Sequence, residues 1–167
     1  MNSILLKGPA VEPISLDEAK AFLRVEHDDD DDVITALIAA ARIYAEAQTR
    51  RALITQSWRL TRDAWPQTGR IAVRPAPLQS LDAVRVYDGG SEPIELDVAG
   101  CFPDVAGCEL VFAPWSMPQP GRAAGIELDV TVGFGDTAVD VPEPLRQAIR
   151  LLAGHWYENR GLVTPGT

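Results

Sequence analysis

The two histidines of this chain lie near carboxylates and are the first candidates for chemistry. His27 directly precedes five consecutive aspartates, Asp28 to Asp32, and His155 lies three residues before Glu158. Calcium loops place their carboxylates at alternate positions and need a glycine at the sharp turn, so consecutive aspartates cannot all reach one ion. A His/Glu pair at this spacing can bind a metal in a helical bundle only when facing helices supply further carboxylates. The other expected helix faces offer Ala, Ile and Leu instead.

Three other patterns that could do chemistry are incomplete. Ser57 lies outside a G-x-S-x-G sequence and has no evident His and Asp partners. The turn at 133–135 lacks the third glycine and the following helix of a dinucleotide-binding loop. Cys101 and Cys108 are the only cysteines, and no further Cys or His stands at zinc-binding spacing. Two ordinary thiols in a reducing compartment are therefore the favoured interpretation.

No set of residues thus combines the convergent titratable groups that catalysis needs. We expect no catalytic residue, no metal and no cofactor. Two other classes of function stay open at this point. One is a small acidic metal-binding protein or enzyme that uses His27, the aspartate run, or His155 with Glu158. The other is an acidic regulatory protein that mimics DNA and binds a DNA-binding protein.

The composition is that of a globular chain with a strongly acidic balance. The chain has 167 residues, of which 46% are hydrophobic, and its formal net charge is −9. Proteins that hold nucleic acid by its phosphates need a basic face, so this balance argues against that class. An acidic surface would repel the phosphate backbone and would suit a conduit through which DNA passes. We also expect no membrane span and no signal peptide, because neither pattern is present.

The strongest element is a long helix that follows the aspartate run. Apolar residues recur there at the i, i+3/i+4 spacing of one helical face, which predicts a helix from about residue 30 to residue 51. The aspartates stand at its positive end, and Arg50 and Arg51 stand at its negative end, where each sign of charge is favourable. Its many alanines favour helix formation and close packing. The expected apolar face comprises Val33, Ile34, Leu37, Ile38, Ala41, Tyr44 and Ala45.

Two further helices are expected near the ends of the chain. Ser15 and Glu18 form a capping box, which predicts a short helix over 16–24. Pro142 and Glu143 follow a capping aspartate, which predicts a second strong helix whose apolar face includes Ile149. We expect the long helix to pack against this C-terminal helix. Residues 1–14 contain two prolines and are expected to be irregular.

The middle of the chain changes to the alternating pattern of strands. Alternation and turn signals predict strands at 56–64, 70–73, 81–87, 93–98, 109–112 and 126–132. The expected fold class is therefore α+β: a helical bundle with an inserted β-rich lobe. We divide the chain into 1–54 (N-terminal helices), 55–136 (the β-rich insert) and 137–167 (the C-terminal helix and tail), as one composite domain.

Several segments together resemble a known family. They are PISLDEAKAFLRV, HDDDDDVITALIAAARIYAEAQTRRAL, ITQSWRLTRDAWP, RPAPLQSLDAVRVYD, VGFGD and VPEPLRQAIRLLAGHWYENR. In this order they resemble the head–tail connector (adaptor) family of tailed phages, in its larger variety with a β-rich middle. They also resemble the adaptor of phage-derived gene transfer agents. The smallest family members are nearly all helical, so the region from 55 to 134 departs from them.

The resemblance implies a structural function without enzymatic activity. Family members form a ring, usually twelvefold, in the neck of the particle, where it joins the portal protein to the stopper or tail components. The ring leaves an axial channel, and DNA passes through it without sequence-specific binding. Such a protein would assemble in the bacterial cytoplasm. The C-terminal segment of the family docks onto the portal, which by position falls here on Trp156, Tyr157, Asn159, Arg160, Leu162 and Val163.

The charged ends of the long helix suggest how neighbouring subunits would meet. A closed ring uses a head-to-tail interface, in which two different surfaces of the chain contact each other. We predict that arginines of one subunit meet acids of the next. The residues concerned are Arg42, Arg50, Arg51 and Asp29, Asp30, Asp31, Asp32.

Overall fold

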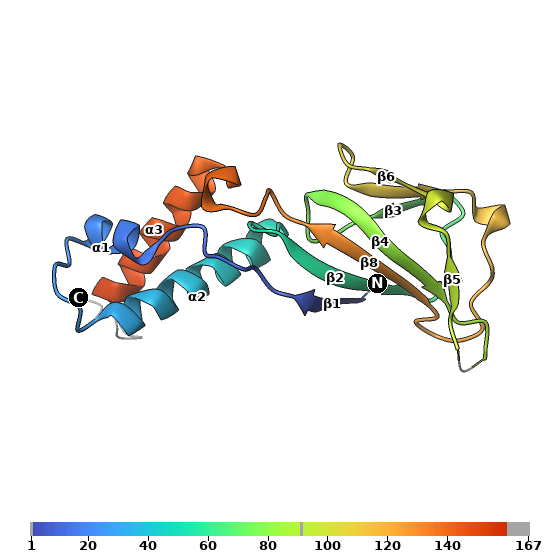
Figure 1. Cartoon of the computed structure of the whole chain (residues 1–167), viewed down its shortest axis with the longest axis horizontal. Coiled ribbons are helices and arrows are strands. Elements are labelled where there is room, and N and C mark those ends of the chain that lie inside the picture. The colour runs from blue at the N-terminus through green and yellow to red at the C-terminus, as the bar shows by residue number, and fades with distance from the viewer. Residues whose placement is uncertain (1, 91, 160–167) are drawn as a thin grey trace, which may run out of the picture.

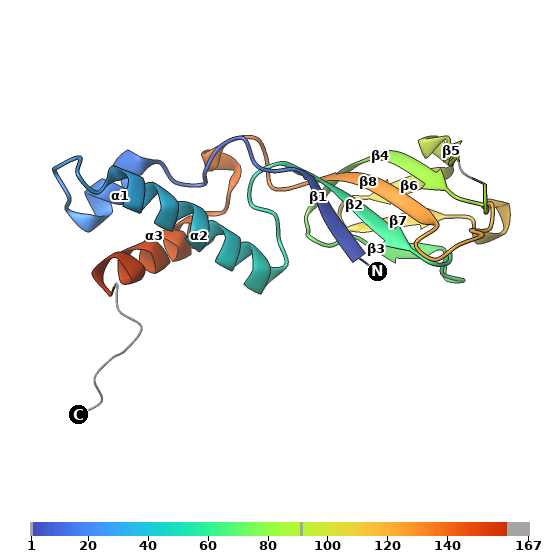
Figure 2. The same cartoon turned by 90° about the horizontal axis from the view of Figure 1, so that it is seen from below.

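The computed structural model describes residues 2–90 and 92–159, which form an elongated molecule with a helical lobe and a β lobe (Figures 1 and 2). The helical lobe holds α1 (Leu16–Leu23), α2 (Asp31–Thr49) and α3 (Glu143–Glu158). The β lobe holds the strands. The expected α+β class, with helices from both ends of the chain and a β-rich insert, is confirmed.

The three helices form where the sequence pattern predicts them. Asp140, which was expected to cap the C-terminal helix, does not do so: it lies in a 3-10 turn and accepts from Thr137, and Pro142 is the N-cap of α3. Ser15 caps α1: its hydroxyl accepts from the backbone N–H of Glu18 at 3.1 Å, and the Glu18 carboxylate accepts from the backbone N–H of Ser15 at 2.9 Å. Helix α2 packs against α3, as expected. Val33 and Tyr44, which were expected on the buried face of α2, are 41% and 48% exposed. The buried core of this lobe comprises Ile14, Ala19, Ile34, Ile38, Ala41, Ala45, Leu53, Ile54, Val141, Ile149 and Ala153.

Two antiparallel sheets build the β lobe. The larger has the order β1-β2-β8-β4-β5 and the smaller has the order β3-β7-β6. Strand β8 alternates cleanly between buried and half-buried residues, so its apolar side chains face the core between the sheets. The strands are β1 (Asn2–Lys7), β2 (Gln56–Arg62), β3 (Arg70–Ala72), β4 (Leu78–Val86), β5 (Ile94–Leu96), β6 (Cys101–Asp104), β7 (Glu109–Phe112) and β8 (Ile126–Val132).

Two strands differ from the sequence prediction. Residues 1–14 were expected to be irregular, but β1 pairs antiparallel with β2 at the edge of the larger sheet. All six residues of β1 are exposed, so the strand carries no alternating signal. Strand β6, at an edge of the smaller sheet, contains Pro103, which weighs against a strand in sequence reasoning but is tolerated at a sheet edge.

Three segments connect the lobes and together form what we call the waist: residues 8–15, 50–55 and 133–142 (Figure 1). Backbone hydrogen bonds tie it to the loop before β4, since Ala76 donates to Arg50 at 3.0 Å and Ala52 donates to Ala76 at 2.8 Å. Gly133 has φ +129, and a Cβ there would lie 2.6 Å from the carbonyl oxygen of Ile54. The waist is thus closely packed and hydrogen-bonded.

The proposed division into three parts stays a prediction, and β1 adds residues of the N-terminal part to the β lobe. Within the described ranges, the helices are too short or too polar to cross a membrane.

Candidate functional site

The end of α3 is already engaged with α2. The ring of Trp156 meets that of Tyr44 edge-on, with centroids 5.9 Å apart. The Tyr157 hydroxyl donates to the Asp30 carboxylate, and the Asn159 amide donates to the carbonyl oxygen of His155 at 2.9 Å. Arg160, Leu162 and Val163 lie outside the described residues. The assignment of these six residues to portal binding therefore stays a prediction.

Some members of the aspartate run pair with residues of the same chain, whereas others are exposed to solvent. Lys20 Nζ lies 2.6 Å from the Asp28 carboxylate and 2.7 Å from that of Asp31. The hydrogen bond from Lys20 holds the pKa of Asp28 below its ordinary value, and the same contact raises the pKa of Lys20. Asp29 and Asp32 are exposed, so these two are the members of the run most open to another subunit.

The three arginines proposed for subunit contacts differ in their surroundings. Arg42 is only 9% exposed, and it pairs with Glu12 at 2.8 Å and with Glu46 at 2.9 Å. Burial opposes its charge, but the two carboxylates outweigh that effect and raise the pKa of Arg42. Arg42 therefore already has two partners within its own chain, whereas Arg50 and Arg51 are exposed. Whether any of the three meets another subunit stays a prediction.

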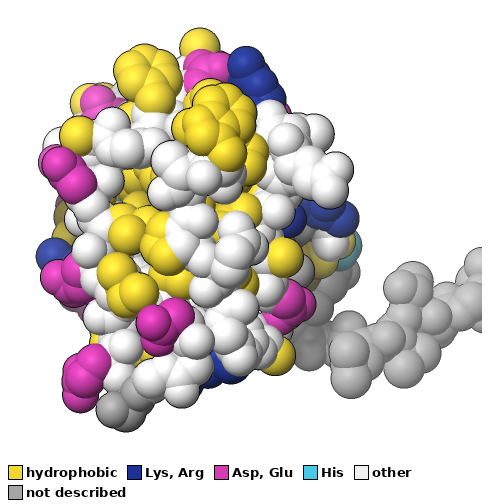
Figure 3. Space-filling view, turned by 90° about the vertical axis from the view of Figure 1, so that its right-hand side faces the viewer, with side chains coloured by type: hydrophobic (Ala, Val, Ile, Leu, Met, Phe, Trp, Pro, Cys, Tyr) yellow, Lys and Arg dark blue, Asp and Glu magenta, His cyan; other side chains and the backbone are white. Residues whose placement is uncertain are grey.

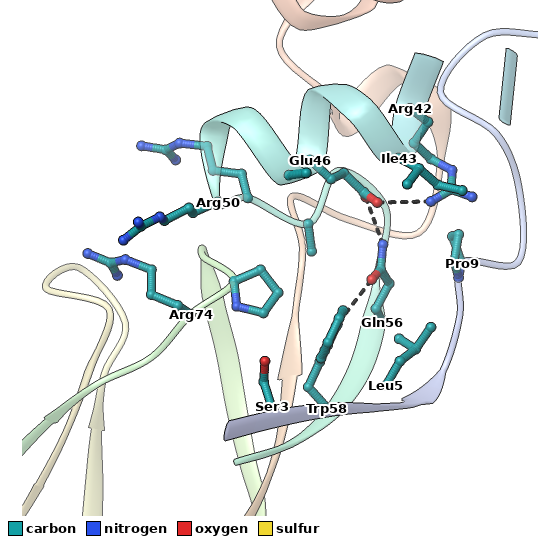
Figure 4. A pocket seen from close by; sticks show the side chains of 14 residues that line it. Ser3, Leu5, Pro9, Arg42, Ile43, Glu46, Arg50, Gln56, Trp58 and Arg74 are labelled. Carbon is teal, nitrogen blue, oxygen red and sulfur yellow. Dashed lines mark hydrogen bonds and ion pairs between the residues drawn. The ribbon is translucent and has the colours of Figure 1, made fainter. Parts of the chain in front are cut away.

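Glu46 is the centre of a hydrogen-bonded network that joins α2 to the β lobe (Figure 4). Its carboxylate accepts from Arg42, from the backbone N–H of Leu53 at 2.8 Å and from the Gln56 amide at 2.7 Å. Gln56 in turn accepts from the indole N–H of Trp58 at 3.0 Å. The i, i+4 spacing of Arg42 and Glu46 is the one sequence signal of this network.

Next to this network lies a groove that sequence reasoning missed (Figure 4). Its volume is about 690 Å³, and its walls come from β1, the second half of α2, the start of β2 and the loop before β4. Its apolar lining includes Leu5, Ile43, Ala47, Trp58 and Pro75. The sequence could not reveal the groove, because its walls are far apart along the chain.

Three arginines stand together at one end of the groove: Arg50, Arg51 and Arg74, which we call the arginine cluster (Figure 4). The paired backbone segments around Arg50 and Ala76 bring them together. Within residues 2–90 and 92–159, none of the three forms an ion pair. Arg51 lies over the ring of Phe134, 5.8 Å from its centroid, and Arg74 donates to the carbonyl oxygen of Val73 at 2.7 Å. The cluster thus concentrates positive charge, without an acidic partner among the residues described, in a chain of net charge −9.

The alternative of a metal site gains no support from the geometry. In the described part of the chain, no group of three or more His, Cys, Asp or Glu side chains is placed to hold a metal ion. His155 Nδ1 lies 3.2 Å from the Asn159 amide rather than beside a carboxylate. Cys101 is buried, which raises the pKa of its thiol.

Exposed aromatic residues mark the β lobe. Figure 3 shows hydrophobic side chains on the face at its far end. Phe102 of β6 and Trp115, in the loop after β7, are 70% and 88% exposed. A two-lobed α+β protein with an apolar groove, a charged cluster and exposed aromatic rings has the surfaces of a protein that assembles with other chains.

The comparisons with known proteins agree with this class. Residues 13–87 match the family of phage gp6-like head-tail connector proteins. No curated protein matches the chain. The resemblance to head–tail connectors, in the form found in gene transfer agents, is confirmed by this match together with the solved structures.

Three solved structures are similar over nearly the whole chain. A chain in the neck of an empty gene transfer agent particle, computed with C6 symmetry, is 26% identical, has a TM-score of 0.84 and aligns over 100% of this chain and 89% of its own. A chain in the neck of a native particle, computed with C12 symmetry, is 29% identical with a TM-score of 0.70, over 98% and 88%. A chain from the virion of a native particle, 24% identical with a TM-score of 0.82 over 100% and 89%, shares the fold.

Proposed function

We propose that this chain is a structural adaptor of the neck of a phage-like particle, where copies of it form a ring between the portal and the stopper or tail components. The observation that carries the proposal is the match of the entire chain, at a TM-score of 0.84, to a chain in a gene transfer agent neck. The C6 and C12 symmetries of the similar necks support a ring of identical subunits. Such a ring assembles in the bacterial cytoplasm before it joins the particle.

The acidic balance suits an axial channel for DNA. A net charge of −9 disfavours tight binding of the phosphate backbone. DNA would therefore pass through the ring without being held. No catalytic step is needed for this function, which agrees with the absence of enzymatic signatures in the sequence.

The end of α3 is the proposed portal contact. Trp156 and Tyr157 hold this end of the helix against α2, so the position of Asn159 is fixed on the helical lobe. The residues that follow join the proposed contact by their position in the sequence. We assign the contact to Asn159, Arg160, Leu162 and Val163, with Trp156 and Tyr157 as its base.

The charged residues at the two ends of α2 are the proposed contacts between neighbours. Asp29 and Asp32 at one end and Arg50 and Arg51 at the other are exposed. Asp30, Asp31 and Arg42 have partners within the chain, so we expect their contribution to be indirect.

Co-production with the portal tests the proposal. We expect native mass measurement and electron microscopy of the purified complex to show a ring, with twelve copies as the expected number, on one face of the portal. A chain that remains monomeric in the presence of portal and does not bind it would overturn the proposal. A monomer in the absence of portal would not, because the portal can be the template for the ring.

A further inference from the structure

The groove and the arginine cluster together define what could bind there. The groove offers an apolar lining, including Ile43, Ala47 and Trp58, and it ends at three guanidinium groups without carboxylate partners in the described ranges. Burying apolar surface is favourable, and guanidinium groups bind carboxylates well. The fitting occupant therefore carries an apolar side chain flanked by carboxylates.

The chain itself presents such a segment at its waist. Val139, in the 3-10 turn η3 (Ala138–Asp140), is 82% exposed. Asp136 and Asp140 flank it and are also exposed. An apolar side chain that projects between two carboxylates has the chemistry that the groove requires.

Contacts within the chain fix the conformation of this turn. The Asp140 carboxylate accepts from the Thr137 backbone N–H at 2.9 Å and from its hydroxyl at 2.7 Å, and these bonds lower the pKa of Asp140. Gly135 packs so closely on Asp140 that a Cβ there would lie 2.4 Å from it. A rigid turn loses little conformational entropy on binding.

The groove and the turn lie on opposite sides of the molecule, and both are near the waist. In Figure 1, the part of the orange segment that leads into α3 and contains the turn lies above the end of α2 and β1. The turn therefore cannot enter the groove of its own chain. Two complementary surfaces on opposite sides are what a head-to-tail ring requires.

We propose that the groove of one copy receives the Val139 turn of the next copy, with Asp136 and Asp140 facing Arg50, Arg51 and Arg74. This inference rests on the proposed ring and specifies its subunit interface. In this interface the arginine cluster pairs with Asp136 and Asp140 of the next copy, and not with the aspartate run. Asp29 and Asp32 lie at the other end of α2, whose 19 residues separate the two ends by about 28 Å.

Cross-linking in assembled necks tests the contact directly. The variant carries Val139→Cys and Ala47→Cys, with Cys108→Ser to remove the other accessible thiol. A short bis-maleimide is expected to produce a ladder of covalent oligomers, which each single cysteine variant does not. The matched control pairs Val139→Cys with Trp115→Cys, at an exposed site in the β lobe. Rings that give no ladder, or an equal ladder with the control pair, would overturn the inference.

Charge reversal gives a second, independent readout. Asp136→Arg and Arg74→Glu are each expected to lower the yield of rings by roughly tenfold, because like charges would then face each other. The double variant is expected to recover most of the yield. Circular dichroism verifies that every variant is folded. Rescue of Arg74→Glu by Asp29→Arg instead of Asp136→Arg would overturn the inference and favour the aspartate run.

The two proposals fail in different ways. If the unmodified chain forms no ring with portal, the adaptor proposal fails and the interface fails with it. If rings form but neither the cross-link nor the charge rescue is seen, only this interface is wrong.

Discussion

At the scale of single residues, Asp129 shows how the β lobe uses charge. Its carboxylate accepts from Arg59 Nε at 2.7 Å and Nη2 at 2.9 Å, and from Arg85 Nη1 at 2.7 Å. Burial disfavours the ionised carboxylate, but the two guanidinium groups outweigh it and hold the pKa of Asp129 below its ordinary value. Because the pKa is lower in the folded state, this stabilisation is present above the unfolded-state pKa and is lost as the pH falls through the folded-state pKa.

Asp129→Asn is therefore expected to lower the free energy of unfolding at pH 7 by about 2 kcal/mol. The difference from the unmodified chain should shrink once the pH falls below about 4, where the carboxylate loses its charge in the unfolded state and then in the folded one. Urea unfolding at pH 7 and at several lower pH values measures both effects. Glu95→Gln is the control, since this exposed carboxylate pairs with the same Arg85. A loss of unfolding free energy that is the same at every pH would contradict this role of the Asp129 charge.

At the scale of elements, the joint between α2 and the β lobe depends on Glu46. This carboxylate accepts from Arg42, Leu53 and Gln56, which belong to α2, the waist and β2. Glu46→Gln removes a largely buried charge and leaves Arg42 with Glu12 alone. We expect a loss of about 3 kcal/mol in the free energy of unfolding, measured by urea titration with circular dichroism. Glu109→Gln, which removes a more exposed pair with Arg70, should cost far less.

The elements also show what could be predicted from sequence. Helices α1, α2 and α3 and strand β8 carry their own periodicity, and α1 also carries a capping box, so their existence was predictable. Strand β1 was not, because all its residues are exposed and only its pairing with β2 makes it a strand. The arginine cluster was only partly predictable. Arg50 and Arg51 end a recognisable helix, whereas Arg74 joins them through backbone pairing of segments distant in sequence.

At the scale of the whole molecule, the two lobes separate two kinds of contact. The waist carries the proposed contact between the groove and the Val139 turn, whereas α3 ends at the far end of the helical lobe, next to the start of α2 (Figure 1). Portal binding and this groove contact would thus use different surfaces. Variants at one surface should leave the other intact, which makes the two functions separable by mutation.

A chain that ends at Asn159 tests this separation. It keeps Trp156 and Tyr157, whose contacts with Tyr44 and Asp30 hold α3 in place, so its free energy of unfolding should be close to that of the full chain. We expect its affinity for the portal to fall by at least about tenfold, because it lacks Arg160, Leu162 and Val163. Surface-immobilised portal measures the affinity. The waist of this chain is unchanged, so rings formed at high concentration should still give the cross-link between positions 47 and 139. Undiminished portal binding would show that the portal contact lies elsewhere.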